Sequence, residues 1–442
     1  MHNPFQRPRA SSRGRSPGTS VRRARCCDTK TGTRSLRSLL AVILGGAVCT
    51  AHALDAPSFA SLLQQAQTGA PQLLEQAANV RAAAADVRQA GAWLNPTLSA
   101  SAENIGTPRQ DGVSQREDTY SVTQVFELGG KRAARIDAEQ RKALAASARE
   151  RQARLGFAAD LAIAYATAEA MQQREAVAAA EQTRAQDDLR AARALVQAGR
   201  EAALRLAQAQ ASAAAAEASV QSAAADAVGA FERLSALVGA TESFTRIVHP
   251  LLPGATTAAT AGWNPADSPA LASVAAERDA LAAQVNVEQK RWLPDVGVTL
   301  GMRKYGWTDE KGATIGLSAT IPLFDRNQGG VDAARERANA AAMRLEATRL
   351  ETVSARRAAL AQVAASSRML DAAEQGETAA NEAYRLGRIG YDAGKTPLVE
   401  LLAIRRALAE ASARTIEARL ARVRALATLS LAEGRPVFGE AP

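Results

Sequence analysis

Histidine and cysteine, the side chains that most often ligate metals or act as nucleophiles, are nearly confined to the first 53 residues. All three cysteines, Cys26, Cys27 and Cys49, lie there, and His249 is the single histidine beyond residue 53. A metal site needs several donors, and a nucleophile needs a base beside it. From residue 54 onward the sequence therefore predicts no catalytic site, no bound metal and no cofactor.

The positive charge of the chain is equally uneven. The net charge is +9, but residues 1–53 contain ten Arg or Lys and a single acidic residue, Asp28. Beyond residue 53 there remain 44 basic and 44 acidic residues. A nucleic-acid-binding surface needs an excess of basic side chains, so we expect no nucleic-acid partner.

The first 53 residues resemble an export signal with a long basic extension. A basic stretch ending at Arg37 precedes the apolar run 39–48, and a small-residue pattern predicts cleavage between Ala53 and Leu54. The run is shorter than a membrane-spanning helix. An uncleaved N-terminal anchor and a lipid on Cys49 remain open as alternatives, although the residues before Cys49 fit a lipidation motif poorly.

Landmark residues then recur at a fixed spacing, which indicates two copies of one unit. Three pairs lie 198 positions apart: Pro71 and Pro269, Pro96 and Pro294, Phe126 and Phe324. Gly199 and Gly394 correspond at a spacing of 195. The predicted organisation is an export signal (1–53), a first repeat (54–240), a linker (241–266), a second repeat (267–433) and a loosely attached tail (434–442).

Each copy is expected to form a helix, two strands, a very long helix and a returning helix. Proline ends the first helix of each copy, and a proline-free stretch follows the strands. The predicted helices are 58–92, 131–198 and 201–238 in the first copy, and 268–291, a long helix from 331 and 396–433 in the second. The predicted strands are 96–104 and 118–126, then 295–303 and 314–322.

The strands are long enough to cross a membrane when tilted. In the third strand Val298 and Leu300 alternate with Thr299, which indicates one apolar and one polar face. Four strands cannot close a barrel, and lipid does not tolerate open strand edges. Three chains would supply twelve strands, an even number in the known range, and two chains would supply eight.

The long helices set the scale of the molecule. A helix of roughly 65 residues is about 100 Å long, because each residue adds about 1.5 Å. Small and apolar residues recur in them at spacings of three and four, a pattern typical of coiled coils. We therefore expect a mainly α protein with a small β part. Its antiparallel coiled coils would form a periplasmic tube beneath a transmembrane β-barrel shared by a homotrimer.

Several motifs, in this order, resemble the TolC-type outer-membrane factors over about 58–433. They are Trp93-Leu94-Asn95-Pro96, the run from Glu127 to Arg132, the run from Ile321 to Gly329, and Ala393-Gly394-Lys395 followed by Glu400-Leu401-Leu402. The run after Glu127 is most similar to the heavy-metal efflux branch. The resemblance implies a passive outer-membrane exit duct with two partners, a periplasmic adaptor and a proton-driven inner-membrane pump of the resistance-nodulation-division class.

Within such a duct, the residues near the two turn glycines are candidates for the periplasmic gate and for adaptor docking. Asp392 and Gln197 would form a ring of carboxylates and amides at the mouth, or would be ordinary solvated helix ends. Arg200 and Lys395 would contact the adaptor beside Gly199 and Gly394, or would complement the helix dipole. A third group marks the corners between strand and helix: Glu127, Gly129, Gly130, Asp325, Asn327 and Gly329.

Four readings of the function remain open. The duct would serve heavy-metal cations, or it would serve multidrug efflux or type I protein secretion. A structural periplasmic coiled coil with small soluble hairpins is the remaining reading. Detergent dependence separates the membrane duct from the soluble coiled coil, because only the duct has a lipid-facing surface.

Overall fold

The computed structural model describes residues 54–439 apart from 110, 254–262 and 309. Contacts divide the chain after Ala51, and every described residue belongs to the second unit. The predicted cleavage residue Ala53 lies outside the described residues. The helices are α1 (Phe59–Gly69), α2 (Pro71–Ala90), α3 (Lys131–Gln197), α4 (Ala203–Val238), α5 (Pro269–Lys290), α6 (Gln328–Asp392) and α7 (Leu398–Glu433), with short 3-10 turns η1 (Pro265–Asp267) and η2 (Val437–Gly439).

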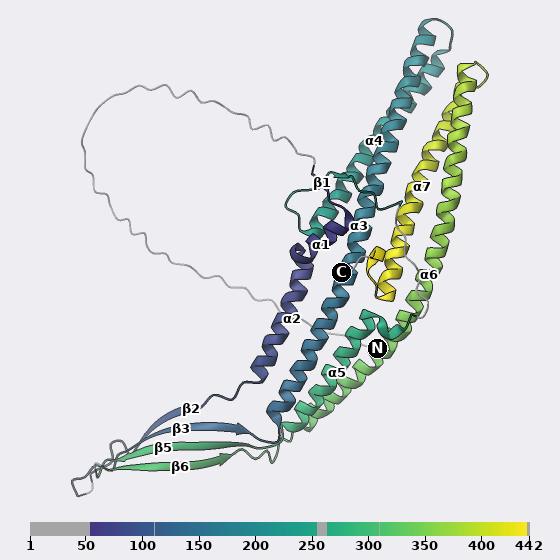
Figure 1. Cartoon of the computed structure of the whole chain (residues 1–442). Coiled ribbons are helices and arrows are strands. Elements are labelled where there is room, and N and C mark those ends of the chain that lie inside the picture. Colours follow the sequence, from purple (N-terminus) through teal and green to yellow (C-terminus); the bar gives the residue numbers. More distant parts are fainter. Residues whose placement is uncertain (1–53, 110, 254–262, 309, 440–442) are drawn as a thin grey trace, which may run out of the picture. The chain divides into compact units, whose positions relative to one another are not determined.

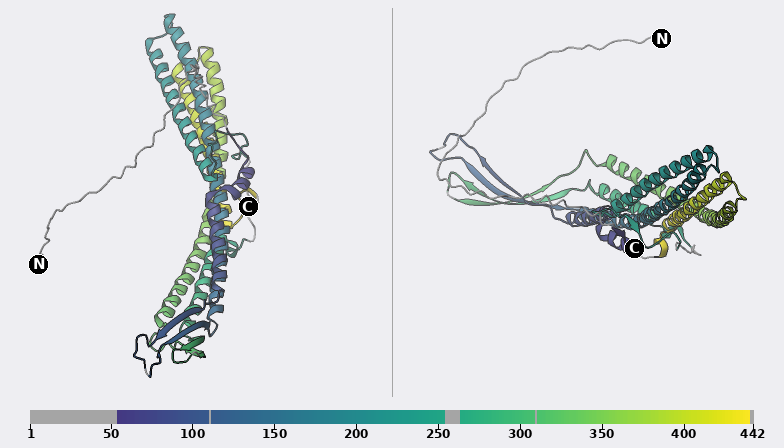
Figure 2. Two further views of the ribbon diagram at one scale, coloured as in Figure 1. Left: turned by 90° about the vertical axis from the view of Figure 1, so that its left-hand side faces the viewer. Right: turned by 90° about the horizontal axis from the view of Figure 1, so that it is seen from above.

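Four strands form one antiparallel sheet in the order β2-β3-β5-β6. Figures 1 and 2 show these strands leaving the ends of the helices side by side. Each repeat contributes one hairpin, and the two hairpins join where β3 pairs with β5. The strands are β2 (Thr97–Glu103), β3 (Glu117–Glu127), β5 (Asp295–Tyr305) and β6 (Lys311–Ala319); β1 (Asp55–Ala56) and β4 (Arg246–Ile247) form a separate parallel pair.

The two long helices, α3 with 67 residues and α6 with 65, confirm the expected scale of about 100 Å each. Each folds back on the next helix, so that α3 packs on α4 and α6 packs on α7 (Figure 1). The first repeat contacts the second through α3, which packs on both α5 and α7. Buried alanines along α3, such as Ala138, Ala145 and Ala162, allow this close approach of helices.

The linker between the repeats is partly fixed onto α3. The Glu169 carboxylate accepts hydrogen bonds from the backbone N–H groups of Leu251 (2.7 Å) and Leu252 (3.0 Å). The Tyr165 hydroxyl donates to the backbone carbonyl of His249 at 2.8 Å. Burial raises the pKa of the Glu169 carboxyl, while the two backbone donors lower it. His249 thus contributes its backbone oxygen here.

Three details differ from expectation. The predicted helix 58–92 is broken at Ala70, which is extended (ψ 122°) because the residue before a proline disfavours the helical region. The last strand lies at Lys311–Ala319, three residues earlier than predicted. The tail is packed as far as it is described, since Val437 is buried and the Phe438 ring meets the Phe59 ring edge-on.

Among the described residues, no helix is both long and apolar enough to cross a membrane.

Candidate functional site

The sheet has one apolar and one polar face, as the alternation predicted. Strand register places Leu300 beside Val122 and Ile315, all three substantially exposed on one face. Further exposed apolar side chains on this face are Leu98, Tyr120, Met302 and Leu317. The register therefore also resolves the second strand, whose alternation is weak in the sequence: Tyr120, Val122 and Phe126 share the apolar face.

The opposite face is lined by hydroxyls and glycines. Thr123 and Thr299 are joined hydroxyl to hydroxyl at 2.8 Å, and Ser99 and Ser121 at the same distance. Near the loop end Arg303 donates to Glu117 at 2.9 Å. A surface of this kind suits contact with water, whereas the apolar face suits lipid.

The first corner is held by Arg132, the last residue of the motif that begins at Glu127, and by Arg135, which lies three residues later in α3. Arg135 donates to both carboxylate oxygens of Glu127, at 2.6 and 3.0 Å, in the bidentate geometry that makes such pairs strong. Arg135 and Arg132 also donate to backbone carbonyls at the end of α2, those of Ala90 and Gly91. The motif thus ties one strand and two helices together.

The glycines of this corner have a conformational role. Gly129 and Gly130 have φ of +67° and +73°, a region in which side chains are strained. A Cβ on Gly129 would also overlap Leu293. In the second copy Asn327 takes the equivalent backbone conformation (φ +57°), with its N–H bonded to Asp325, and Gly329 lies in the first turn of α6.

The two helix tips also have the predicted geometry. Gly199 and Gly394 have φ of +68° and +72°, and the following N–H groups close the helices, Arg200 to Leu195 and Lys395 to Gly390. This is the Schellman arrangement, in which a left-handed glycine satisfies the last carbonyls of a helix. Both Arg200 and Lys395 are exposed.

The gate candidates occupy matching positions, because Gln197 ends α3 and Asp392 ends α6. Both are exposed. Asp392 accepts a hydrogen bond from Arg388 at 3.3 Å, one helical turn earlier. The cation of Arg388 therefore belongs to any electrostatic account of this end of the helix.

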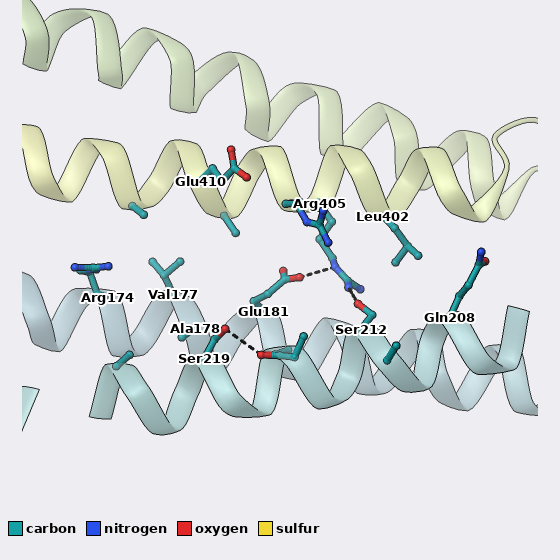
Figure 3. A pocket seen from close by; sticks show the side chains of 17 residues that line it. Arg174, Val177, Ala178, Glu181, Gln208, Ser212, Ser219, Leu402, Arg405 and Glu410 are labelled. Carbon is teal, nitrogen blue, oxygen red and sulfur yellow. Dashed lines mark hydrogen bonds and ion pairs between the residues drawn. The ribbon is translucent and has the colours of Figure 1, made fainter. Parts of the chain in front are cut away.

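The sequence did not predict a buried ionic cluster that joins the helical hairpin α3–α4 to the helical hairpin α6–α7. Arg405 of α7 is 3% exposed and forms ion pairs with Glu181 (2.6 Å) and Asp188, both on α3. It also donates to Ser212 of α4 at 2.9 Å. Figure 3 shows Arg405 reaching toward Glu181 and Ser212. The groove that these residues line has a volume of about 650 Å³, and its other lining side chains are mainly small.

Burial raises the pKa values of the Glu181 and Asp188 carboxyls, while Arg405 opposes the rise. The signal for this cluster is in the sequence. Leu398, Leu401, Arg405 and Leu408 are buried along α7 at spacings of three and four, so the arginine occupies a coiled-coil core position. An arginine at such a position requires buried acceptors on a neighbouring helix.

Residues 62–240 and 265–435 match the model of a protein family described as "Outer membrane efflux protein". The chain belongs to this outer membrane efflux protein family. The first matched segment runs from α1 to α4, and the second runs from η1 to α7. The resemblance inferred from the motifs is therefore confirmed, and with it the outer-membrane location and a role as an efflux channel rather than an enzyme.

The chain is also similar to two named metal-resistance proteins. The chain is 54% identical over 389 residues to the nickel-cobalt-cadmium resistance protein NccC of Alcaligenes xylosoxydans xylosoxydans, covering 88% of this chain and 89% of that protein. It is 55% identical over 393 residues to the nickel and cobalt resistance protein CnrC of Cupriavidus metallidurans, covering 89% and 94%.

Solved structures confirm the fold. The outer membrane channel CmeC of Campylobacter jejuni superposes with a TM-score of 0.74 at 16% identity, covering 87% of each chain. The expected fold class, mainly helical with a small sheet, is the fold of these channels.

Proposed function

We propose that this efflux protein is the outer-membrane exit duct for heavy-metal cations, with nickel, cobalt and cadmium as the first candidates. The observation that carries the choice of cargo is identity above 50% with two metal-resistance proteins along almost the whole chain. The likeness to solved channels, at lower identity, supports only the fold.

The duct is assembled from three copies. The sheet has an apolar face for lipid and a polar face for water, and its two edge strands, β2 and β6, pair with nothing further among the described residues. Unpaired edges are costly in lipid, and closure removes them. Three copies bring twelve strands together, and their long helices continue the lumen away from the membrane.

The partners are a periplasmic adaptor and an inner-membrane pump of the resistance-nodulation-division class. The adaptor docks at the exposed tips around Gly199 and Gly394, where Arg200 and Lys395 offer it positive charges. Energy comes from the pump, and the duct supplies a passive path. At the same end, Asp392 and Gln197 line the periplasmic gate.

The cargo is tested by deleting the gene in its host and measuring growth in nickel, cobalt and cadmium salts and in a panel of antibiotics. We expect reduced tolerance of the metals alone, restored by the unmodified gene. Unchanged metal tolerance with lost antibiotic tolerance would favour multidrug efflux. Loss of an exported protein from the medium would favour type I secretion.

A further inference from the structure

Two lysines lie opposite each other on the apolar face of the sheet. In β5, Lys304 follows Leu300 and Met302 at spacings of two, so it belongs to the same face as these residues. The strand register pairs Lys304 with Lys311, the first residue of β6. Both lysines are exposed. The face that suits lipid therefore ends in a pair of adjacent cations.

The lysine pair lies at the end of the sheet that is away from the helices. Figure 1 shows β5 ending and β6 beginning at this free end, whereas the opposite ends of the strands join the helices. In the proposed duct the long helices continue the lumen into the periplasm. The free end of the sheet, with its two lysines, therefore reaches the outer surface of the membrane.

The length of β5 is consistent with this level. Eight residue steps separate Val296 from Lys304. At about 3.3 Å per residue and a tilt near 40°, they lie roughly 20 Å apart across the membrane, and the apolar band of such barrels is about 25 Å tall. Trp307, three residues farther on, is exposed and its ring lies 4.6 Å from that of Tyr305. Aromatic side chains are typical of the membrane–water boundary, so the lysines lie at the level of the lipid headgroups.

The nearest acidic side chains of β3 are paired with other residues. Asp118 lies opposite Lys304, but it accepts a hydrogen bond from Arg116 at 2.9 Å. Glu117 accepts one from Arg303 on the polar face of the sheet. Among the described residues, neither lysine has an ion-pair partner. Like charges directly opposite each other in a sheet repel, so this pair favours an anion from outside the chain.

The surface next to the lysines indicates which anion this is. Leu300, Met302 and Ile315 are exposed on the same face, on the side toward the helices. Lipid chains would cover these side chains in a membrane. An anion that approaches the lysines from this face is therefore attached to such chains. A phosphate group suits two ammonium groups, because each ammonium has three N–H donors and hydrogen bonds between charged groups are strong.

We propose that Lys304 and Lys311 bind the phosphate of an outer-leaflet lipid whose chains lie along Leu300, Met302 and Ile315. This inference rests on the proposed duct, because the apolar face must meet lipid, but it does not depend on the cargo. Each copy in the trimer would carry one such site. Binding would fix the level of the sheet relative to the outer leaflet.

Lipid binding by the purified protein in an uncharged detergent tests the site. The probe is fluorescently labelled lipid A with both of its phosphates, and fluorescence anisotropy measures its affinity. Lys304→Gln/Lys311→Gln should bind the probe at least tenfold more weakly than the unmodified chain. Removing the phosphates from the probe should weaken binding to the unmodified chain similarly, with no further loss in the double variant. If the double variant fails to fold, each single variant should show part of the loss.

Two controls separate this site from general attraction of anions. Arg303 is adjacent to Lys304 in the sequence but lies on the opposite face, so Arg303→Gln should change the affinity less than twofold. Excess inorganic phosphate, compared with chloride at equal ionic strength, should displace little of the probe because it has no chains. Full displacement would overturn the lipid as the occupant and leave a site for free phosphate.

Membrane fractionation separates failure of the site from failure of the duct. The site is overturned if the unmodified chain needs detergent for extraction but binds the probe equally well without the two lysines or without the phosphates. Equal losses in Arg303→Gln and in the double variant would overturn it as well. In each of these cases the duct stands. An unmodified chain that is soluble without detergent would overturn the duct, and the lipid site with it.

Discussion

At the scale of single residues, Arg405 is a buried cation that contacts acceptors on two other helices. Three different nitrogens of its guanidinium reach Glu181, Asp188 and Ser212, whereas a lysine would have to reach all three from a single nitrogen. Glu181 also lies 3.8 Å from Arg184 on its own helix, whereas Arg405 is the cation that reaches both carboxylates from a neighbouring helix. Burial raises the pKa values of both carboxyls. Its members come from α3, α4 and α7, so the cluster forms only when α7 packs against the helical hairpin α3–α4.

Replacing Arg405 with Met should therefore destabilise the protein at neutral pH by about 3–5 kcal/mol, the usual cost of leaving buried charges unpaired. Without the cation the pKa values of Glu181 and Asp188 rise further. A carboxyl whose folded-state pKa is raised favours folding below its unfolded value and loses that contribution as pH rises through the folded value. The deficit should thus shrink on acidification. Thermal unfolding of the helices in detergent, followed by circular dichroism across a pH series, measures it.

The control variant removes all three charges, as Arg405→Met with Glu181→Gln and Asp188→Asn. It should recover much of the lost stability at neutral pH, because no unpaired charge remains buried. A deficit that is the same at every pH, and unchanged in the triple variant, would show that packing rather than charge is what Arg405 contributes.

Some residues were predictable and others were not, for a definite reason. Gly199 and Gly394 follow long helical patterns and were identified as turns, because a left-handed helix end selects glycine locally. Arg405 was missed because its role depends on acceptors more than 190 positions away in the sequence. The repeats show which helices correspond, but they do not show which residues face one another.

At the scale of elements, those that depend on their own sequence were likewise predicted better than those that depend on a distant partner. Helix α3 was predicted almost to the residue, since it depends on periodicity within its own sequence. The end of β6 was misplaced, because a strand extends only as far as its partner. The break at Ala70 had a local signal in Pro71 that continuous helical periodicity concealed.

The two faces of β5 provide a prediction about insertion. Leu300 is 57% exposed on the apolar face, so Leu300→Arg should impair insertion by about 2–4 kcal/mol, the cost of an arginine near the bilayer midplane. Thr299 lies on the opposite face, so Thr299→Lys should insert nearly normally and lose only the hydroxyl contact to Thr123. The quantity of folded protein in outer-membrane fractions measures both. Equal damage from the two changes would mean that the faces are reversed.

The corner between β3 and α3 provides a prediction about stability. Gly129→Ala should destabilise the protein by roughly 1–2 kcal/mol from the left-handed backbone alone, with a further loss from overlap with Leu293. Gly329→Ala is the matched control, because Gly329 is helical and a Cβ there would meet nothing within 4 Å. That change should be neutral or stabilise by up to about 1 kcal/mol. If thermal unfolding midpoints in detergent fell equally, the conformational role of Gly129 would be refuted.

At the scale of the whole molecule, a single chain cannot close its own sheet into a barrel, because it contributes four strands to that sheet. Among the residues that the structure describes, its sheet has two open edges and a lipid-compatible face, and its two long helical hairpins end in exposed tips. No group of three or more His, Cys, Asp or Glu residues in the described part of the chain is arranged to hold a metal. In the proposed duct, we expect the chain to act on ions through the charge of its narrow end.

That charge can be measured at Asp392. In a trimer, three carboxylates would alternate with three amides from Gln197 at the ends of the long helices, a ring that favours cations. Each carboxylate is also paired with Arg388 at 3.3 Å, so the local balance is close to neutral and sensitive to a single change. Asp392→Asn should leave Arg388 uncompensated and lower the cation preference of the channel in planar bilayers. Arg388→Gln should raise that preference, and Asp392→Arg should abolish or reverse it. None of the three should reduce the amount of trimer, because the Arg388 and Asp392 side chains are 47% and 60% exposed. If all three variants conduct with unchanged selectivity, Asp392 lies on the outer surface of the tube, and a contact with the adaptor remains as its role.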